Sequence, residues 1–498
     1  MAGKFSITTA IPYVNAKGHV GFAMELIQAD VLARFERLRG NNVFFLTGTD
    51  ENALKNVQAA EKANKPIREF IDEHAKSFIE LAKLLNISND DFIRTTEGRH
   101  IKGAQKLWRA CEAAGDIYKK KYKGLYCVGC EEFKTEKDLI DGLCPEHNTK
   151  LEEIEEENYF FRLSKYQDKV EKLIFSDELR IVPITRKNEA LSFIRQGLQD
   201  FSISRSRERA KNWGIPVPGD DSQIIYVWYD ALTWFINALG YSDNEEKFKL
   251  WWSDRNIDLI GKGINRFHTI YWPVMLISAG LLPPKEIYIH GYITIGGEKI
   301  SKSLGNTIDP VDLVGKYGVE IVRYFLLREI PSDGDGDFSV KKLEARHNAD
   351  LANNLGNLVS RVVALIEKFF SGSFNYSRRF VLKEVDDKVI DIWKKYNENI
   401  NNFKLHIALE NIFSLVDFAN LYIDEHKPWS LGDNPEHLNE VMTNLIVILL
   451  NVAWFLKPFL PETSNRIFGI LGADKDGKSW EEKPFQVKPE ILFPKIEQ

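Results

Sequence analysis

Residues Ala16 to Asp30 read AKGHVGFAMELIQAD, a glycine-containing turn that leads directly into a helical pattern. The turn follows Phe5 to Ala10 (FSITTA), a short apolar run of the kind that forms a β-strand. A glycine turn between a strand and a helix is suited to phosphate, because the first amides of the helix have no partner inside it. Phe22, however, has neither a charge nor a hydrogen-bond donor on its side chain. The stretch therefore predicts a nucleotide site that contains one unexpected residue.

The segments around this turn predict a β–α–β unit. Apolar residues recur at helical spacing after it, namely Ala23, Leu26, Ile27, Val31, Phe35 and Leu38. Gly40 stops this helix, and Val43 to Thr47 (VFFLT) is a continuous apolar strand of the type buried in parallel sheets. A second helical stretch covers roughly residues 66–85. The alternation predicts an α/β fold with a doubly wound, Rossmann-type parallel sheet, in which residues 18–22 and 48–51 lie at the ligand-binding edge.

The rest of the chain predicts an insertion into this sheet and a helical end. Residues 118–150 are rich in Lys and Glu and contain a cysteine cluster, which indicates an inserted module. Parallel-sheet patterns return in three apolar runs, at residues 224–228 (IIYVW), 257–260 (IDLI) and 287–289. From about Lys341 onward the pattern is almost wholly helical.

Composition describes an ordinary globular protein. The chain has 498 residues, of which 44% are hydrophobic and 28% charged, so several domains are expected. Its four cysteines are too few for a disulfide framework, which favours a reducing, cytoplasmic location. The longest apolar run, residues 445–456, is too short to span a bilayer, and the N-terminus lacks the layout of a signal peptide, so no membrane association is expected. The net charge of −6 excludes a basic coat over the whole molecule, but not a local basic track for nucleic acid.

Three cysteines and a histidine are spaced like the ligands of a structural zinc ion. Cys127, Cys130, Cys144 and His147 form the pattern C-x2-C-x13-C-x2-H. Three thiolates and one imidazole would close a tetrahedral site and leave no position for water, which indicates a structural role. The alternative is a chance cluster of cysteines in a surface knuckle.

A second glycine-containing loop carries two lysines. Residues 296–306 read GGEKISKSLGN, in which Lys299 and Lys302 can act as mobile charges for a polyphosphate while the glycines let the loop close. The spacing excludes a Walker loop, since no G-x4-G-K-[ST] pattern is present. Taken alone, the loop is equally compatible with a solvated surface turn.

These motifs together resemble the class I aminoacyl-tRNA synthetases. KISKS at residues 299–303 resembles the KMSKS signature of that family, and GHVG at 18–21 resembles most of its HIGH signature. With the cysteine cluster and the helical C-terminus, the closest resemblance is to the methionyl-tRNA synthetases. Further matches, in family order, are AIPYVN at 10–15, TGTDE at 47–51, WGIPVP at 213–218, YVWYDA at 226–231, FH at 267–268, WP at 272–273 and KPW at 427–429.

The resemblance implies a two-step ligase reaction. Methionine and ATP would give methionyl-adenylate, and the methionyl group would then pass to the 3′-terminal ribose of initiator and elongator tRNA(Met). Cations are needed where negative charge grows on the phosphates, and Mg2+ would accompany the ATP. The residues implied as catalytic are His19, Arg205, Lys299 and Lys302, and those implied to bind ATP are Gly18, His19, Gly21, Phe22, Lys299, Ser301, Lys302 and Ser303. For Arg205 the alternative is a surface arginine.

The resemblance also implies a methionine pocket. Its residues are Ile11, Tyr13, Asp50, Trp228, Phe235, His268 and Trp272, with Asp50 as the carboxylate for the substrate ammonium and aromatic walls around the thioether. Core packing is the alternative for Trp228, His268 and Trp272, and a plain turn aspartate is the alternative for Asp50. The family has a tyrosine at the position of Phe235, so a hydroxyl contact to the ligand is absent here.

The helical end is implied to read the anticodon. Asn357 and Arg361 are four residues apart and share one helix face, and Trp429 offers an aromatic ring on which a base can stack. The alternative for all three is an ordinary helical core or surface. The implied parts are the first half of a Rossmann catalytic domain (1–115), a connective insertion with the zinc knuckle (116–223), the second half of the catalytic domain (224–295), the KISKS loop and stem-contact region (296–350) and an all-α anticodon-binding domain (351–498). No appended β-barrel-like extension is visible in the sequence, which favours a monomer.

Three positions near the predicted ATP site depart from the family pattern. Phe22 replaces the last histidine of HIGH, Asn52–Ala53 replaces a common His–Gly pair, and Gly263 replaces a common Asp. Loss of one well-placed donor costs about 10²–10³ in rate, which Lys17 or Lys262 would have to offset. The departures leave a non-catalytic tRNA- or nucleotide-binding paralogue as one alternative. The other is a class I synthetase for a small apolar amino acid, although 498 residues leave no room for the large editing insertion usual there.

Overall fold

The computed structural model describes residues 3–127, 132–134, 136, 139–145, 148–252, 255–299, 308–475 and 484–497. For residues 132, 133 and 299 it describes the backbone only. The chain divides into two compact units. Unit 1 comprises Met1–Ala29 and Glu36–His290, and unit 2 comprises Asp30–Phe35 and Gly291–Gln498. Unit 1 is α/β with a parallel sheet and unit 2 is largely helical, which confirms the predicted combination of an α/β part and a helical C-terminal part.

Unit 1 is built on a six-stranded sheet in which neighbouring strands run parallel. The strand order is β3 (Asp91–Arg94), β2 (Asn42–Thr49), β1 (Lys4–Thr8), β12 (Arg255–Gly261), β13 (Glu286–His290) and β7 (Arg180–Val182). The chain builds outward from β1 through β2 to β3, and β12 and β13 later extend the sheet on the other side of β1. The direction of winding therefore reverses between β1 and β12, and ligands bind beyond the carboxyl ends of the strands at such a reversal.

The two helices predicted near the N-terminus are present. α1 (Val20–Leu38) is buried along most of its length, as expected for the central helix of a doubly wound sheet. α3 (Ile67–Leu84) buries one apolar stripe, which consists of Phe70, Ile71, Ala75, Phe78, Leu81 and Ala82. The other helices of unit 1 that are used below are α2 (Leu54–Lys62), α4 (Gly98–Ala113), α5 (Gln167–Phe175), α7 (Val227–Leu232), α8 (Trp234–Asn237) and α10 (Trp272–Ser278).

The Lys/Glu-rich segment forms a separate antiparallel sheet of four strands. Their order is β5 (Glu132–Lys134), β4 (Ile117–Cys127), β6 (Glu152–Phe161) and β8 (Phe201–Ser202). The basic strand β4 lies opposite the acidic strand β6, so that Lys121 faces Glu157 and Lys123 faces Glu155. Opposite charges directly across an antiparallel pair stabilise it, which accounts for the unusual composition of this segment.

The prediction of a parallel strand at residues 224–228 is wrong. β11 (Asp220–Ile225) pairs antiparallel with β9 (Ser204–Ser206) and β10 (Pro216–Val217), and Val227 begins α7. Residues 224–227 are all buried, and burial on both sides gives a continuous apolar run whatever the backbone conformation. Hydrophobic pattern alone does not separate a buried strand from the start of a buried helix.

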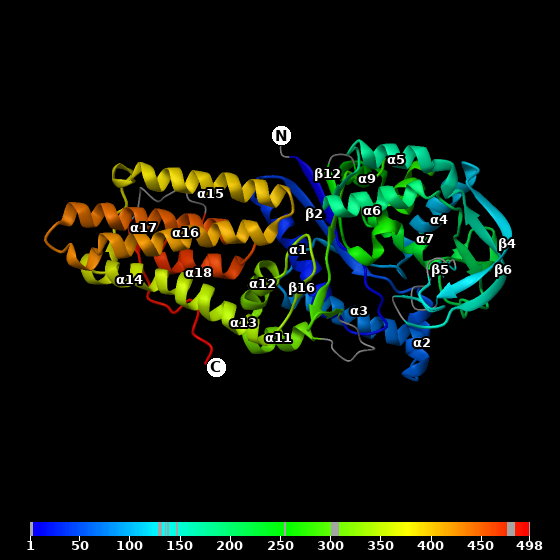
Figure 1. Cartoon of the computed structure of the whole chain (residues 1–498), viewed down its shortest axis with the longest axis horizontal. Helices are drawn as coiled ribbons and strands as arrows, with labels where there is room; N and C mark the ends of the chain where they lie inside the picture. The colour runs from blue at the N-terminus through cyan, green and yellow to red at the C-terminus, as the bar shows by residue number, and fades with distance from the viewer. Residues whose placement is uncertain are drawn as a thin grey trace. The chain divides into compact units, whose positions relative to one another are not determined.

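Unit 2 confirms the prediction of a helical C-terminal part. A small sheet of β14 (Ile293–Ile295), β15 (Glu298–Lys299) and β16 (Gly336–Asp337) comes first. The helices that follow are α11 (Pro310–Tyr317), α12 (Val319–Arg328), α13 (Val340–Arg346), the π-helix η6 (His347–Gly356), α14 (Asn357–Phe370), α15 (Lys383–Asn401), α16 (Leu405–His426), α17 (Pro435–Leu456) and α18 (Pro461–Leu471). α15, α16 and α17 lie side by side in an elongated bundle (Figure 1). Among the described residues, one helix, α17, is both long enough and apolar enough to cross a membrane. However, 78% of its most apolar 18-residue window is buried in the fold.

Candidate active site

The turn before α1 presents an imidazole N–H at the positive end of the helix. The carbonyl of His19 accepts hydrogen bonds from the amides of Phe22 (3.0 Å) and Ala23 (3.2 Å), so His19 caps α1. Its ring Nδ1 accepts a third bond, from the amide of Gly21, at 3.0 Å. Because Nδ1 accepts, the proton of the neutral ring is on Nε2, which can donate to an anion in front of the helix.

The two glycines of this turn are required by close contacts. A Cβ on Gly21 would lie 2.8 Å from Cε1 of His19, so only glycine lets the imidazole fold back over the helix start. A Cβ on Gly18 would lie 2.9 Å from Leu81 and 3.0 Å from Phe78, both on α3. The turn is therefore pressed against α3, and its shape depends on the absence of side chains at both positions.

Phe22 is a packing residue of the same turn. Its side chain is only 9% exposed. Its ring meets that of Phe78 edge to face, with the ring centres 5.4 Å apart and the planes at 82°. This is a favourable geometry for an aromatic pair. The ring of Phe22 thus joins α1 to α3.

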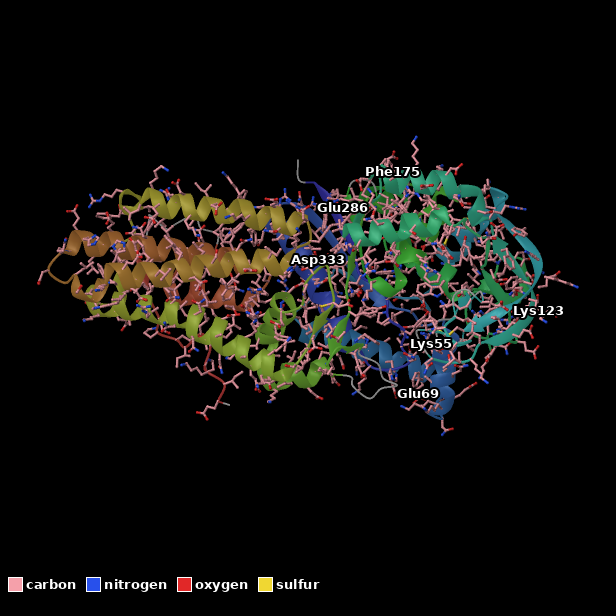
Figure 2. The ribbon with its side chains drawn as sticks, viewed as in Figure 1. Lys55, Glu69, Lys123, Phe175, Glu286 and Asp333 are labelled. Carbon is pink, nitrogen blue, oxygen red and sulfur yellow. The ribbon has the colours of Figure 1, made fainter. Side chains whose placement is uncertain are left out.

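Asp50 lies at the carboxyl end of β2, beside the segment that follows β1. The amide of Asp50 donates to the carbonyl of Pro12 at 2.9 Å, and Tyr13 forms a parallel bridge with Asp50. The carboxylate is 3% exposed, and its Oδ1 accepts from the amide of Asn52 at 3.3 Å. Lys55 of α2, labelled in Figure 2, has its Nζ 3.7 Å from the centre of the Tyr13 ring. The strand ends of β1 and β2 thus place a carboxylate next to an aromatic ring that carries a cation.

The aromatic residues of the predicted pocket, apart from Tyr13, belong to one cluster. Tyr13 packs against a smaller cluster of Ala53, Tyr226 and Val227. Trp228 stacks face to face on Phe267, with ring centres 3.8 Å apart and an angle of 2°. Phe235 contacts His268 edge to face at 5.6 Å and Trp272 at 5.6 Å. Ile11 packs against the same core cluster. The structure therefore brings together predicted pocket residues that are up to 261 positions apart in the chain, from Ile11 to Trp272.

His268 is held neutral in this cluster. It belongs to the π-helix η4 (Phe267–Tyr271), where its Nδ1 lies 2.9 Å from the carbonyl of Ile264 and donates to it. Burial lowers the pKa of His268 to about 4, so the ring carries no charge near neutral pH. With the proton on Nδ1, Nε2 is a hydrogen-bond acceptor. The indole N–H of Trp228 is buried and has no hydrogen-bond partner among the described residues, so the cluster also holds a donor.

Arg205 is not a surface arginine. It is 7% exposed, and its guanidinium lies between the rings of Tyr126 and Tyr226, at 4.9 and 4.8 Å from their centres. It also donates to the hydroxyl of Tyr126 at 2.5 Å. The surface alternative is therefore excluded, since a buried cation held by two aromatic rings is fixed in place.

Comparison with known proteins shows which family the chain belongs to. The family model for class I tRNA synthetases of the methionine type matches residues 5–363, and that for the anticodon-binding domain of tRNA ligases matches residues 383–495. The methionine–tRNA ligase of Thermotoga maritima is 43% identical over 489 residues, which are 97% of this chain and 76% of that protein. The ligase of Brucella melitensis is 43% identical over 486 residues, which are 96% of this chain and 93% of that protein. The chain belongs to the methionine–tRNA ligases.

Solved structures agree with this family. The Mycobacterium tuberculosis methionyl-tRNA synthetase in complex with methionyl-adenylate is 38% identical and superposes with a TM-score of 0.92, covering 99% of this chain and 100% of that one. The apo form of the same enzyme is 34% identical, with a TM-score of 0.85. As a member of the family, the chain is an ATP-dependent aminoacyl-tRNA ligase.

Several predicted site residues of this ligase lie outside the described residues. They are Ser301, Lys302 and Ser303 of the KISKS loop and Cys130 and His147 of the cysteine cluster, and of Lys299 only the backbone is described, in β15. The two described members of the cysteine cluster, Cys127 and Cys144, are buried and form no disulfide among the described residues. No group of three or more His, Cys, Asp or Glu residues that could hold a metal occurs in the described part of the chain. Buried thiols outside any disulfide fit a zinc site, because thiolate is the ligand that zinc prefers in structural sites.

The predicted anticodon residues of the ligase lie on α14 and on the 3-10 helix η8 (Pro428–Ser430) of unit 2. Asn357 begins α14 and is exposed, and Arg361 follows one turn later. The guanidinium of Arg361 donates to Asp424 at 2.5 Å and lies 6.0 Å from the centre of the Trp429 ring. Trp429 is 47% exposed. An exposed indole beside a paired guanidinium is suited to stacking with a nucleobase.

Two features of the site in unit 1 were not predicted from the sequence. Asp258, on β12, is fully buried, accepts from the hydroxyl of Thr8 at 3.1 Å, and has its pKa raised to about 7 by burial. A single carboxylate inside the apolar run IDLI was the available signal, because charged residues are rare in buried strands. The other feature is the pair His100 and Asp230, which are 130 residues apart and gave no local signal.

Proposed function

We propose that the site in unit 1 activates methionine with ATP and that the chain then transfers the methionyl group to the 3′-terminal ribose of initiator and elongator tRNA(Met). The observation that carries this is a series of contacts that links the Asp50 carboxylate to the aromatic cluster. Asp50 forms a bridge with Tyr13. Tyr13 and Trp228 pack against the same buried residues, and Trp228 also packs against the cluster that contains Phe235 and Trp272. A carboxylate pairs with an ammonium, and aromatic rings suit a polarizable thioether. The related enzyme of known structure with methionyl-adenylate bound supports the same assignment.

In the first step, a carboxylate oxygen of methionine attacks the α-phosphorus of ATP. The bond from that phosphorus to the bridging oxygen breaks, and pyrophosphate leaves with the electron pair. His19 would donate from Nε2 to a phosphate oxygen at the start of α1, where the helix dipole also favours negative charge. Lys299 and Lys302, with Ser301 and Ser303, would hold the leaving pyrophosphate, and bound Mg2+ would supply further positive charge there. Gly18 and Gly21 would let the phosphates approach the backbone, and Arg205 would add a fixed positive charge.

The amino-acid pocket would combine one ionic contact with an apolar enclosure. Asp50 would bind the ammonium, and Ile11, Tyr13, Trp228, Phe235, His268 and Trp272 would enclose the side chain. Neutral His268 fits this role, because a charged imidazole would disfavour an uncharged thioether. In unit 2, Asn357, Arg361 and Trp429 would read the anticodon, with a base stacked on the exposed indole.

The remaining assignments are also proposals. Cys127, Cys130, Cys144 and His147 would bind a structural zinc ion, and the zinc content of a Cys127→Ser variant, which should fall to background, tests this. The five-part division with boundaries at residues 115, 223, 295 and 350 is retained as a proposal, as are a monomeric state and a cytoplasmic location. The last is supported by Cys111, Cys127 and Cys144, which form no disulfide among the described residues.

Methionine-dependent ATP–pyrophosphate exchange tests the proposed function. Asp50→Asn keeps the size of the side chain but removes its charge, so the KM for methionine should rise about 100-fold or more. Asp168→Asn, which changes an exposed aspartate of α5 in the same unit, is the matched control and should leave exchange unchanged. Lys302→Ala should lower the exchange rate about 10²-fold or more. Equal KM values for the Asp50→Asn variant and the unchanged protein would overturn the assignment of the ammonium site.

A further inference from the structure

A chain of four polar side chains runs through the core of unit 1 and ends beside Asp50. Asn237 at the end of α8 lies against His100 of α4, which lies against Asp230 of α7, which in turn lies against Asn52. His100 and Asp230 are completely buried, and Asn237 is 1% exposed. Only Asn52 is partly exposed, at the end next to the proposed ammonium site.

The hydrogen bonds of His100 orient its ring toward Asp230. The amide nitrogen of Asn237 donates to the carbonyl of His100 (3.2 Å) and to the hydroxyl oxygen of Thr233 (2.9 Å), which sets the orientation of that amide. The same nitrogen lies 3.3 Å from Nδ1 of His100. Nε2 faces the Asp230 carboxylate, which can only accept, so Nε2 carries a proton. Nε2 then donates to Oδ1 of Asp230 at 2.5 Å. A Cβ on Gly103 would lie 1.9 Å from Oδ1 of Asn237, so glycine at this position leaves the space that the amide occupies.

The second oxygen of Asp230 holds Asn52. The amide nitrogen of the Asn52 side chain donates to Oδ2 of Asp230 at 2.7 Å and to the carbonyl of Thr95 at 3.2 Å. Both amide hydrogens of Asn52 are therefore used, and its side chain cannot turn without breaking a bond. The backbone N–H of Asn52 faces Oδ1 of Asp50 at 3.3 Å. The orientation of the Asp50 carboxylate is thus linked to a residue that is itself fixed from the core.

We propose that His100 and Asp230 are positioning residues for the Asp50 carboxylate, acting through Asn52, and that they thereby set the recognition of the amino-acid ammonium. This inference rests on the proposed function, because it takes the substrate ammonium to bind Asp50. A buried histidine–aspartate pair is costly to desolvate, and apolar residues of similar volume would fill the same space at no such cost. The chain of side chains that contains this pair ends beside Asp50, at Asn52, which is its one partly exposed member. Orienting Asp50 is therefore a function that accounts for a buried ionic pair at this place.

The test compares two ligands that differ only in the ammonium group. In Asn52→Ala and Asp230→Asn, the KM for methionine in ATP–pyrophosphate exchange should rise about tenfold, because a carboxylate that is out of place by a fraction of an ångström loses much of its contact. The KM for ATP should change by less than about twofold. The affinity for 4-(methylthio)butanoate, which is methionine without its amino group, should be the same in the variants and in the unchanged protein. General damage to the pocket would weaken both ligands equally and would overturn the proposal.

A reciprocal exchange gives a rescue that structural damage does not. Asn52→Asp alone places two carboxylates together and should impair methionine binding more than Asn52→Ala does. With Asp230→Asn added, residue 230 can accept from His100 and donate to residue 52, but residue 52 still has no donor for the carbonyl of Thr95. The double variant should therefore recover in part, with a KM for methionine about tenfold lower than that of Asn52→Asp alone. Asn444→Ala is the matched control, since Asn444 is a buried asparagine of unit 2 with bonds to Phe380, Leu382 and Glu440.

The outcomes separate this proposal from the proposed function. If Asp50→Asn loses methionine but the Asn52 and Asp230 variants behave like the unchanged protein, Asp50 binds the ammonium without help from the buried chain, and the inference is wrong. Failure of the double variant to recover would also contradict it. If Asp50→Asn has no effect, the ammonium site itself is misassigned and both proposals fall.

Discussion

Replacement of Phe22 by histidine would restore the usual fourth residue of the HIGH signature, but it should cost stability without adding activity. The ring of Phe22 is 9% exposed and meets Phe78 edge to face at 5.4 Å. Loss of that pair removes about 0.5–1.5 kcal/mol. A largely buried imidazole with an unmade hydrogen bond costs a further 1–3 kcal/mol or so. Phe22→His should therefore lower the free energy of unfolding by roughly 2–4 kcal/mol.

The rate of methionine activation should rise by less than about threefold in this variant, whereas a donor aimed at the reacting phosphates is worth about 10²–10³. Urea unfolding and ATP–pyrophosphate exchange measure the two effects on the same samples. Phe22→Leu is the matched control, because it keeps an apolar side chain and should lose only the aromatic pair, about 1 kcal/mol. A gain of about 100-fold in exchange with unchanged stability would refute the packing role and show that position 22 faces the nucleotide.

Three further predictions follow from the same contacts. Gly21→Ala should displace the His19 ring, 2.8 Å from the new Cβ, and raise the KM for ATP about tenfold, while Gly98→Ala, where a Cβ meets nothing within 4 Å, should leave it unchanged. Asp258 has a folded-state pKa of about 7, raised from 3.8 by burial, so the unfolded chain loses this proton first and stability falls as pH rises from about 4 to 7, by up to roughly 4 kcal/mol. Unfolding of Asp258→Asn across this range should lack that slope, and a difference between variant and unchanged protein that does not vary with pH would contradict the assignment. Trp429→Ala should spare pyrophosphate exchange and lower tRNA(Met) charging at least about tenfold. Trp393→Ala, which changes a tryptophan of similar exposure on α15, should spare both activities. Equal losses of exchange and charging in Trp429→Ala would remove Trp429 from anticodon reading.

The long periodic elements of the fold could be predicted from the sequence, and the short ones could not. α1 and α3 extend over 19 and 18 residues, long enough for a helical period to be unmistakable. β7 has only three residues and joins the parallel sheet at its edge, beside β13, so neither its length nor its composition marks it. The prediction of a parallel strand at residues 224–228 is wrong because this buried run contains the end of β11 and the start of α7.

The candidate site shows the same division between local and distant signals. Asp50, Trp228 and His268 could be proposed from motifs. In the structure Trp228 and His268 contact the aromatic cluster and Asp50 forms a bridge with Tyr13, and the roles of all three stay predictions. The burial of Phe22 against Phe78 depends on how α3 packs on α1, which no local pattern states. The bond between His100 and Asp230 joins residues 130 positions apart and becomes visible only when α4 and α7 are placed in space. Burial also sets the low pKa of His268 and the high pKa of Asp258, and burial is a property of the fold.

The most direct test of the account is ATP–pyrophosphate exchange with each of the twenty amino acids in turn, followed by charging of initiator and elongator tRNA(Met). The account predicts exchange with methionine, little or none with valine, leucine or isoleucine, and charging of both tRNAs. Exchange that is strongest with another apolar amino acid would show that the cluster around Phe235 and Trp272 encloses a different side chain. Exchange with no amino acid, in a protein that binds tRNA(Met), would contradict the central claim.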